Sequence, residues 1–229
     1  MADDSDIRWT IKDPCAEQRE VENKVAELFL MCAGAPLAAR AAVFVEGIEL
    51  DAPCVSEAAF LRVADVVFRS CRDWSAGFEI KKVPHSLFVI GCGPNNAAAF
   101  RIIAFDLEAM MRAAPGLGRA LDAHHVLITH SVVQAIGPDG EDAMSPANRL
   151  LVRQVAESGY DLDSLPWGYR QCLVARMFDG RNGRERSFAW MQPVEGDEPR
   201  AELPPSMFAP YHMVDAGVSA PPVRTPAEA

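Results

Sequence analysis

The sequence predicts an α/β domain with a mixed, partly parallel sheet, helices on both faces and a C-terminal β-hairpin; an α+β arrangement is the alternative. First, segments with helical and strand periodicity alternate along the chain, which favours crossover connections between parallel strands. Second, residues 86–90 and 126–136 are apolar on both faces, as is typical of strands covered on both sides. Third, residues 179–183 are rich in Gly and Asn and indicate a hairpin turn.

The first half of the domain begins with a helix whose start is marked by two residues. Asp13 can cap this helix and Pro14 suits its first position, and apolar residues follow at helical spacing. A run of β-branched and aromatic residues then predicts a strand over residues 41–50. Ser56 is a capping residue and predicts the start of a second helix.

In the second half, a buried strand leads into a loop that contains two glycines. The strand is expected over residues 86–90 and the loop over residues 91–96. Apolar residues behind the loop fit helical spacing and predict a long helix to about residue 113, ended by Pro115 and Gly116. The remaining expected elements are a strand at 126–136, a helix at 145–157 and the hairpin strands at 171–178 and 187–191.

Composition divides the chain into three parts. Residues 1–12 are expected to form a flexible leader, and residues 13–192 a single globular domain. Eight of the 17 prolines lie between Pro193 and Pro226, which predicts a disordered, proline-rich tail over residues 193–229. Phe208 and Tyr211 belong to a small apolar group within that tail and are candidate partner-binding residues.

The chain is acidic, with a formal net charge of -10. A surface of that sign repels phosphate backbones, so nucleic acid is disfavoured as a partner. The sequence shows neither a secretory signal nor an apolar run that could cross a bilayer, so no membrane association is expected. The six cysteines form no CxxC pair, which argues against a zinc site and favours free thiols in the cytoplasm.

The histidines do not predict a metal site. His124 and His130 would share one face of a strand, but six residues of strand would separate them by about 20 Å, too far for one ion. No metal and no cofactor is therefore expected.

The loop at residues 91–96, Gly-Cys-Gly-Pro-Asn-Asn, most suggests a site, because a helix is expected directly behind it. The first N–H groups of a helix can hold an anion, and glycines let a ligand approach the backbone. A helix start also lowers the pKa of a thiol, which makes Cys92 the candidate catalytic residue. The candidate ligand-binding residues are Gly91, Gly93, Asn95 and Asn96. The alternative is a tight turn in which Cys92 is merely small.

Residues 89–94, Val-Ile-Gly-Cys-Gly-Pro, resemble the glycine-rich first loop of S-adenosylmethionine-dependent methyltransferases. That resemblance implies a cofactor at this loop, although Asn95 stands where the family has its third glycine. His130 and Ser131 stand where the family holds the ribose with an acidic residue. Residues 90–94 also resemble the cysteine turn of the PfpI superfamily, which implies a nucleophilic Cys92 beside an acid or base.

Arginines on the expected hairpin form a second candidate site. Arg181, Arg184 and Arg186 could make a basic ribbon that contacts phosphate or an acidic partner. The alternative is a solvated hairpin whose arginines protect an edge strand from aggregation.

These patterns together favour a non-catalytic binding or accessory protein that contacts a protein partner, or a second copy of itself, through its domain and tail. The alternative is a small-ligand-binding domain or an enzyme, methyltransferase-like or cysteine-dependent, that uses residues 91–96. No complete catalytic constellation is visible, and no motif excludes one.

Overall fold

The computed structural model describes residues 16–78, 84–135 and 169–203. The chain divides into two compact units, residues 1–131 with 171–205, and residues 132–170 with 206–229. Of the second unit, only the short strand segments 132–135 and 169–170 are described. The predicted helix at 145–157 and most of the predicted tail lie outside the described residues.

The described elements are four helices and seven strands. In chain order they are α1 (Ala16–Ala33), the 3-10 helix η1 (Leu37–Ala42), β1 (Phe44–Glu49), α2 (Glu57–Ser75), β2 (His85–Cys92), β3 (Ala98–Ala104), α3 (Leu107–Ala120), β4 (His125–Ala135), β5 (Tyr169–Asp179), β6 (Glu185–Pro193) and β7 (Ala201–Leu203).

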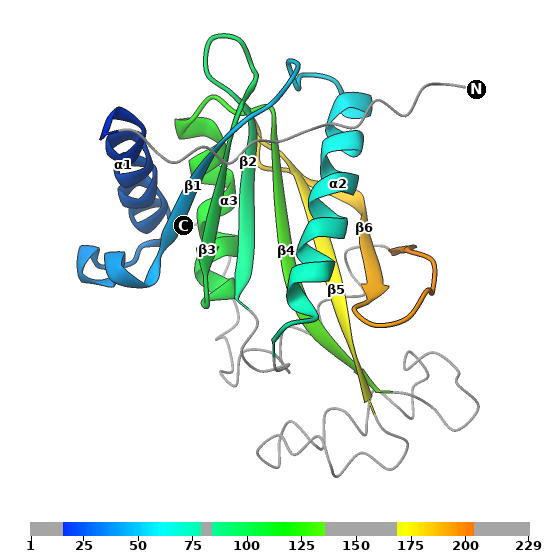
Figure 1. The fold of residues 1–229 in the computed structure, drawn as a ribbon. Coiled ribbons are helices and arrows are strands. Elements are labelled where there is room, and N and C mark those ends of the chain that lie inside the picture. Colours follow the sequence, from blue (N-terminus) through cyan, green and yellow to red (C-terminus); the bar gives the residue numbers. More distant parts are fainter. Residues whose placement is uncertain (1–15, 79–83, 136–168, 204–229) are drawn as a thin grey trace, which may run out of the picture. The chain divides into compact units, whose positions relative to one another are not determined.

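The seven strands form one antiparallel sheet in the order β1-β3-β2-β4-β5-β6-β7 (Figure 1). The prediction of a partly parallel sheet is therefore wrong. As the alternation suggested, helical connections do join strands that run in the same direction. Each connection, however, passes over one strand that lies between the two strands it joins. β3 lies between β1 and β2, and β2 lies between β3 and β4, so every neighbour is antiparallel.

The helices cover both faces of this sheet. α2 packs on one face, whereas α1 and α3 pack on the other (Figure 1). The strand directions explain this division, because β1 and β2 run opposite to β3 and β4. Two connections of the same hand over strands of opposite direction must place their helices on opposite faces.

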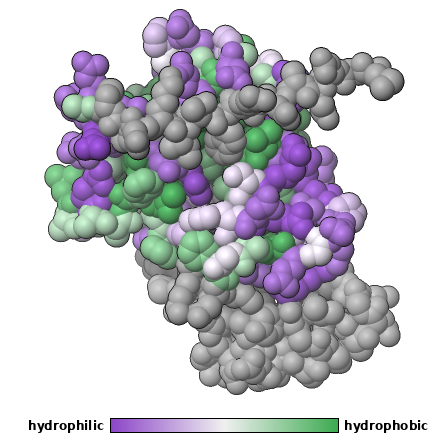
Figure 2. All heavy atoms as spheres, viewed as in Figure 1, coloured by the Kyte–Doolittle hydropathy of each residue, from purple (hydrophilic) through white to green (hydrophobic). Residues whose placement is uncertain are grey.

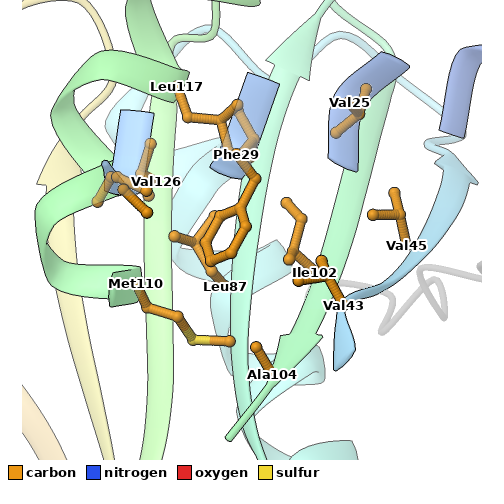
Figure 3. Packing of buried hydrophobic residues seen from close by; sticks show 14 of the residues in the cluster. Val25, Phe29, Val43, Val45, Leu87, Ile102, Ala104, Met110, Leu117 and Val126 are labelled. Carbon is orange, nitrogen blue, oxygen red and sulfur yellow. The ribbon is translucent and has the colours of Figure 1, made fainter. Parts of the chain in front are cut away.

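The core on the α1 and α3 face is packed around the side chain of Phe29. Phe29 of α1 points toward Leu87 and Ile102 of the sheet, and Met110 and Leu117 of α3 lie beside it (Figure 3). All five side chains are almost completely buried. Burial of this apolar area stabilises the packing of both helices on the sheet.

The core on the α2 face is richer in aromatic rings. Phe60 and Phe68 of α2 pack against Phe88 of β2 and Trp190 of β6, and Phe68 meets Trp190 edge-on at 6.0 Å between ring centroids. Ser56 accepts a hydrogen bond from the N–H of Ala59, which confirms the predicted cap of this helix.

One predicted helix is wrong. Behind the loop at 91–96 the chain forms strand β3, and helix α3 starts only at Leu107. β3 is the second strand from the edge, and apolar residues on both of its faces satisfy helical spacing as well as strand burial. α3 also continues past Pro115 to Ala120, instead of ending there.

Regular structure continues past Gln192, where the globular domain was predicted to end. β7 pairs with β6, and the loop before it is fastened to α2. The guanidinium of Arg72 donates to the carbonyl oxygens of Pro193 at 2.9 Å and Val194 at 3.2 Å, and also to that of Gly196. The domain therefore extends at least to Leu203.

The surface visible in Figure 2 is hydrophilic over α2, whereas paler hydrophobic colours lie over η1. Leu37 of η1 is one of the large apolar side chains that stay exposed. Within the described ranges, no helix is both long and apolar enough to cross a membrane.

Candidate functional site

The loop at residues 91–96 is the turn of the β2–β3 hairpin, and no helix follows it. Gly91 forms a bulge in β2 with a φ of +76°. A Cβ built on Gly91 would lie 2.4 Å from the carbonyl oxygen of Cys54, so only glycine fits here. The N–H of Cys54 in turn donates to the carbonyl of Asn96 at 2.8 Å, which fastens the loop before α2 to the turn.

A groove of about 400 Å³ lies beside this turn. Its walls come from α1 (Gln18 and Val21), β1 (residues 47–49), the turn (residues 92–95 and 97) and β3 (residues 98–100). Several of the lining residues are small, among them Gly47, Ala97 and Ala98. Val21 and Phe100 give the groove apolar sides, and the polar groups lie among Gln18, Glu49 and Asn95.

The groove therefore contains three of the residues that the sequence pointed to, which are Cys92, Gly93 and Asn95. Gly91 and Asn96 are not among its lining residues and instead shape the turn. The anion site expected at a helix start has no structural basis here, because β3 takes the place of the helix. Ligand binding by these residues stays a prediction.

The surroundings of Cys92 do not favour the thiolate that a nucleophile needs. Its side chain is almost fully buried. Burial raises the pKa of the Cys92 thiol to about 12, and the carboxylate of Asp122 adds to the effect. The thiol is therefore protonated at neutral pH, opposite to what a helix start would produce.

The outer edge of β1 beside the groove is occupied by side chains of α1 and η1. Glu22 accepts a hydrogen bond from the N–H of Gly47 at 2.9 Å, and Gln18 donates to the same carboxylate at 3.2 Å. Arg40 donates to the carbonyl of Val43 at 2.6 Å. These side chains cover backbone groups that an edge strand would otherwise leave open to pairing.

The arginine hairpin, defined here as residues 179–186, meets the start of β4. Arg181 lies 2.9 Å from His124 Nε2, and Arg186 lies 3.1 Å from His125 Nδ1. Because an arginine can only donate, both histidine nitrogens accept. The structure thus joins the arginines to two histidines that are far away in the sequence.

Arg186 is the best anchored of these arginines. It forms an ion pair with Glu57 at 2.8 Å and lies 5.0 Å from the ring centroid of Phe60. The ring of His125 stacks on the same phenylalanine at 4.4 Å. Burial, followed by the positive charge of Arg186, lowers the pKa of His125 to about 4, so this ring is neutral at neutral pH.

The carboxylate of Glu185 in the hairpin pairs with Arg176 of β5, whose guanidinium donates to it at 2.5 Å and 2.7 Å. The side chains of Arg181 and Arg184 are exposed. Partner binding by the hairpin stays a prediction, as does binding by Phe208 and Tyr211, which lie outside the described residues.

Nowhere in the described part do three His, Cys, Asp or Glu side chains form a possible metal site.

Sequence reasoning missed the α1 and β1 walls of the groove. The one available signal was Gly47, because a glycine inside a strand often marks a close approach or an open space. Gln18 and Val21 could not be found this way, since nothing local places α1 beside the β2–β3 turn.

Comparisons with family models, with curated proteins and with solved structures found no match to this chain.

Proposed function

We propose that this chain is a non-catalytic binding protein whose groove beside the β2–β3 turn takes an apolar group of a protein partner. The observation that carries the proposal is the groove itself, about 400 Å³ in volume and lined mostly by apolar and small residues. Sites for small organic groups have volumes of roughly 300–1,000 Å³ and a few polar groups at their rim. Gln18, Glu49 and Asn95 supply such a rim.

The state of Cys92 supports binding over catalysis. A cysteine-dependent enzyme needs a thiolate beside a base, whereas this thiol has a pKa of about 12 and is almost completely buried. The methyltransferase-like alternative loses the helix start that would hold the cofactor, because a strand follows the turn.

A reducing compartment such as the cytoplasm fits the proposal. The described cysteines, Cys32, Cys54, Cys71, Cys92 and Cys172, are all free thiols. Most of them are buried, as small apolar residues are in proteins that carry no disulfides.

The experiment uses indole as a probe of the groove, observed by saturation-transfer NMR. Indole should bind the wild-type chain weakly, with a dissociation constant on the order of millimolar. Ala98→Leu should remove most of the signal, because the larger side chain fills the groove. Ala42→Leu is the matched control, since Ala42 is exposed at the end of η1, away from the groove lining.

The fold of both variants is checked by urea unfolding. Equal indole signals from Ala98→Leu and Ala42→Leu would overturn the proposal, because binding would then not depend on the groove.

A further inference from the structure

We infer that the groove is an intramolecular docking site for residues 7–12 of this chain, with Trp9 as the side chain that fills it. This inference rests on the proposed function, because it names an occupant of the same groove. The segment would act as a built-in competitor that a partner must displace.

Position is the first argument. Gln18 and Val21, which line the groove, belong to the first two turns of α1, and α1 begins at Ala16. Trp9 precedes Ala16 by seven residues, a length of chain that can extend over about 23–25 Å. This length is enough for the chain to bring Trp9 to the groove.

The pattern of the segment is the second argument. Ile7, Trp9 and Ile11 alternate with Arg8, Thr10 and Lys12. In an extended segment this alternation would gather the three apolar residues on one face and the polar residues on the other. One such face is what an apolar groove can bind, while the opposite face stays in water.

Charge is the third argument. Among the described residues that line the groove there is no Lys or Arg, whereas Glu49 is one of them, and the carboxylate of Glu22 lies next to the groove on Gly47. Arg8 and Lys12 flank Trp9, so the signs are complementary. The other apolar candidate, the group with Phe208 and Tyr211, has no Lys or Arg between residues 201 and 223. Charge therefore favours the segment before α1.

The size and chemistry of the Trp9 side chain also fit the groove. An indole ring is a large apolar body with one N–H donor, and tryptophan commonly anchors a segment in a pocket with its ring buried and its N–H at a polar rim. Gln18 and Asn95 offer side-chain carbonyl oxygens among the lining residues for that donor.

The test measures indole binding to the full chain with Trp9→Ser, again by saturation-transfer NMR. If residues 7–12 hold the groove most of the time, removing Trp9 should tighten indole binding by about fivefold or more, because a competitor has gone. Arg8→Glu with Lys12→Glu should tighten indole binding in the same direction. Arg62→Glu with Arg69→Glu, an equal charge change at exposed positions of α2, should not.

A second readout follows Trp9 directly in the full chain labelled with 5-fluorotryptophan, with Trp9→Phe used to assign its fluorine signal. Ala98→Leu should shift the Trp9 signal and Ala42→Leu should leave it in place. Equal indole affinity for the wild type and Trp9→Ser would overturn the inference and leave the proposed function standing. Indole binding to neither protein would overturn both.

Discussion

Two segments that the sequence singled out, residues 91–96 and 179–183, are both hairpin turns in the structure, but they differ in charge and in openness. The β5–β6 turn carries many charged side chains, and most of them are engaged: Arg186 with Glu57 and His125, and Arg181 with His124. The β2–β3 turn carries almost no charge and leaves a groove beside it. The turn with more charged residues is therefore the one whose side chains find partners within the molecule.

The difference shows that a groove at the surface can depend on residues with small side chains. Charged residues brought together by a fold tend to pair, since an unpaired charge that is partly buried costs free energy. Short side chains such as those of Ala97 and Ala98 fill little space, and they line the groove beside the turn. Gly47 instead admits a neighbouring side chain, since a Cβ there would lie 3.2 Å from Gln18 Nε2. Three predictions test this comparison.

The largest effect is expected at Gly91. Gly91→Ala should lower the free energy of unfolding by about 4 kcal/mol, because a Cβ would meet the Cys54 carbonyl oxygen at 2.4 Å. Gly93 has the same φ of +76°, but a Cβ there would lie 3.9 Å from Ala98. Gly93→Ala should therefore cost only about 1 kcal/mol of backbone strain. Urea unfolding measures both, and equal losses would show that strain alone, and not the contact with Cys54, constrains the turn.

The next effect is a pH dependence of the unfolding free energy that originates at His125, which contacts the arginine hairpin, and at His85. Burial lowers the pKa of both His125 and His85 to about 4, from an ordinary value of 6.5. Each therefore binds its proton less readily in the folded state, and its stabilising contribution is complete above pH 6.5 and is lost as the pH falls toward 4. The loss is at most about 3 kcal/mol for each histidine.

The control for this effect is His125→Phe, which keeps a ring that can stack on Phe60. The loss of unfolding free energy between pH 7 and pH 4.5 should be smaller in this variant than in the wild type by about 2 kcal/mol. Parallel pH profiles of the two proteins would contradict the assignment of the effect to His125.

The smallest effect compares two arginines of the same hairpin. Arg186→Ala should lower the unfolding free energy by about 1–2 kcal/mol, because the ion pair with Glu57, the bond to His125 and the contact with Phe60 are lost together. Arg181→Ala should change it by less than about 0.5 kcal/mol, because that side chain is exposed. A larger loss for Arg181→Ala than for Arg186→Ala would reverse the ranking of the two contacts.

Local patterns predicted those elements whose chemistry is local. Ser56 caps α2 as expected, and the hairpin of β5 and β6 forms around residues 179–183. β3 could not be distinguished from a helix, because its apolar residues on both faces also satisfy helical spacing. Pro115 did not end α3, and the neighbouring Gly116 instead lets α1 approach closely, since a Cβ there would lie 3.0 Å from Cys32 Sγ.

For the candidate site, too, the sequence pointed to the residues of the local turn but not to the wall formed by distant elements. The turn residues Cys92, Gly93 and Asn95 stood out in the sequence and do line the groove, although the helix that drew attention to them is absent. The opposite wall comes from α1 and β1, and only the sheet order places these beside the turn. Sequence periodicity carries no information on that order.

The interleaved order of the first four strands has a consequence for how the chain assembles. β1 pairs only with β3 among the described strands, so during synthesis it has no strand partner until the ribosome has released residues 98–104. β2 and β3 form a local hairpin, with β1 paired to its β3 side and β4 paired to its β2 side. Neither β1–α2–β2 nor β3–α3–β4 can complete its own sheet, because each lacks the strand that lies inside it. We therefore expect this part of the molecule to fold in one cooperative step, and a cut between β2 and β3 to yield fragments that regain structure only when they are mixed.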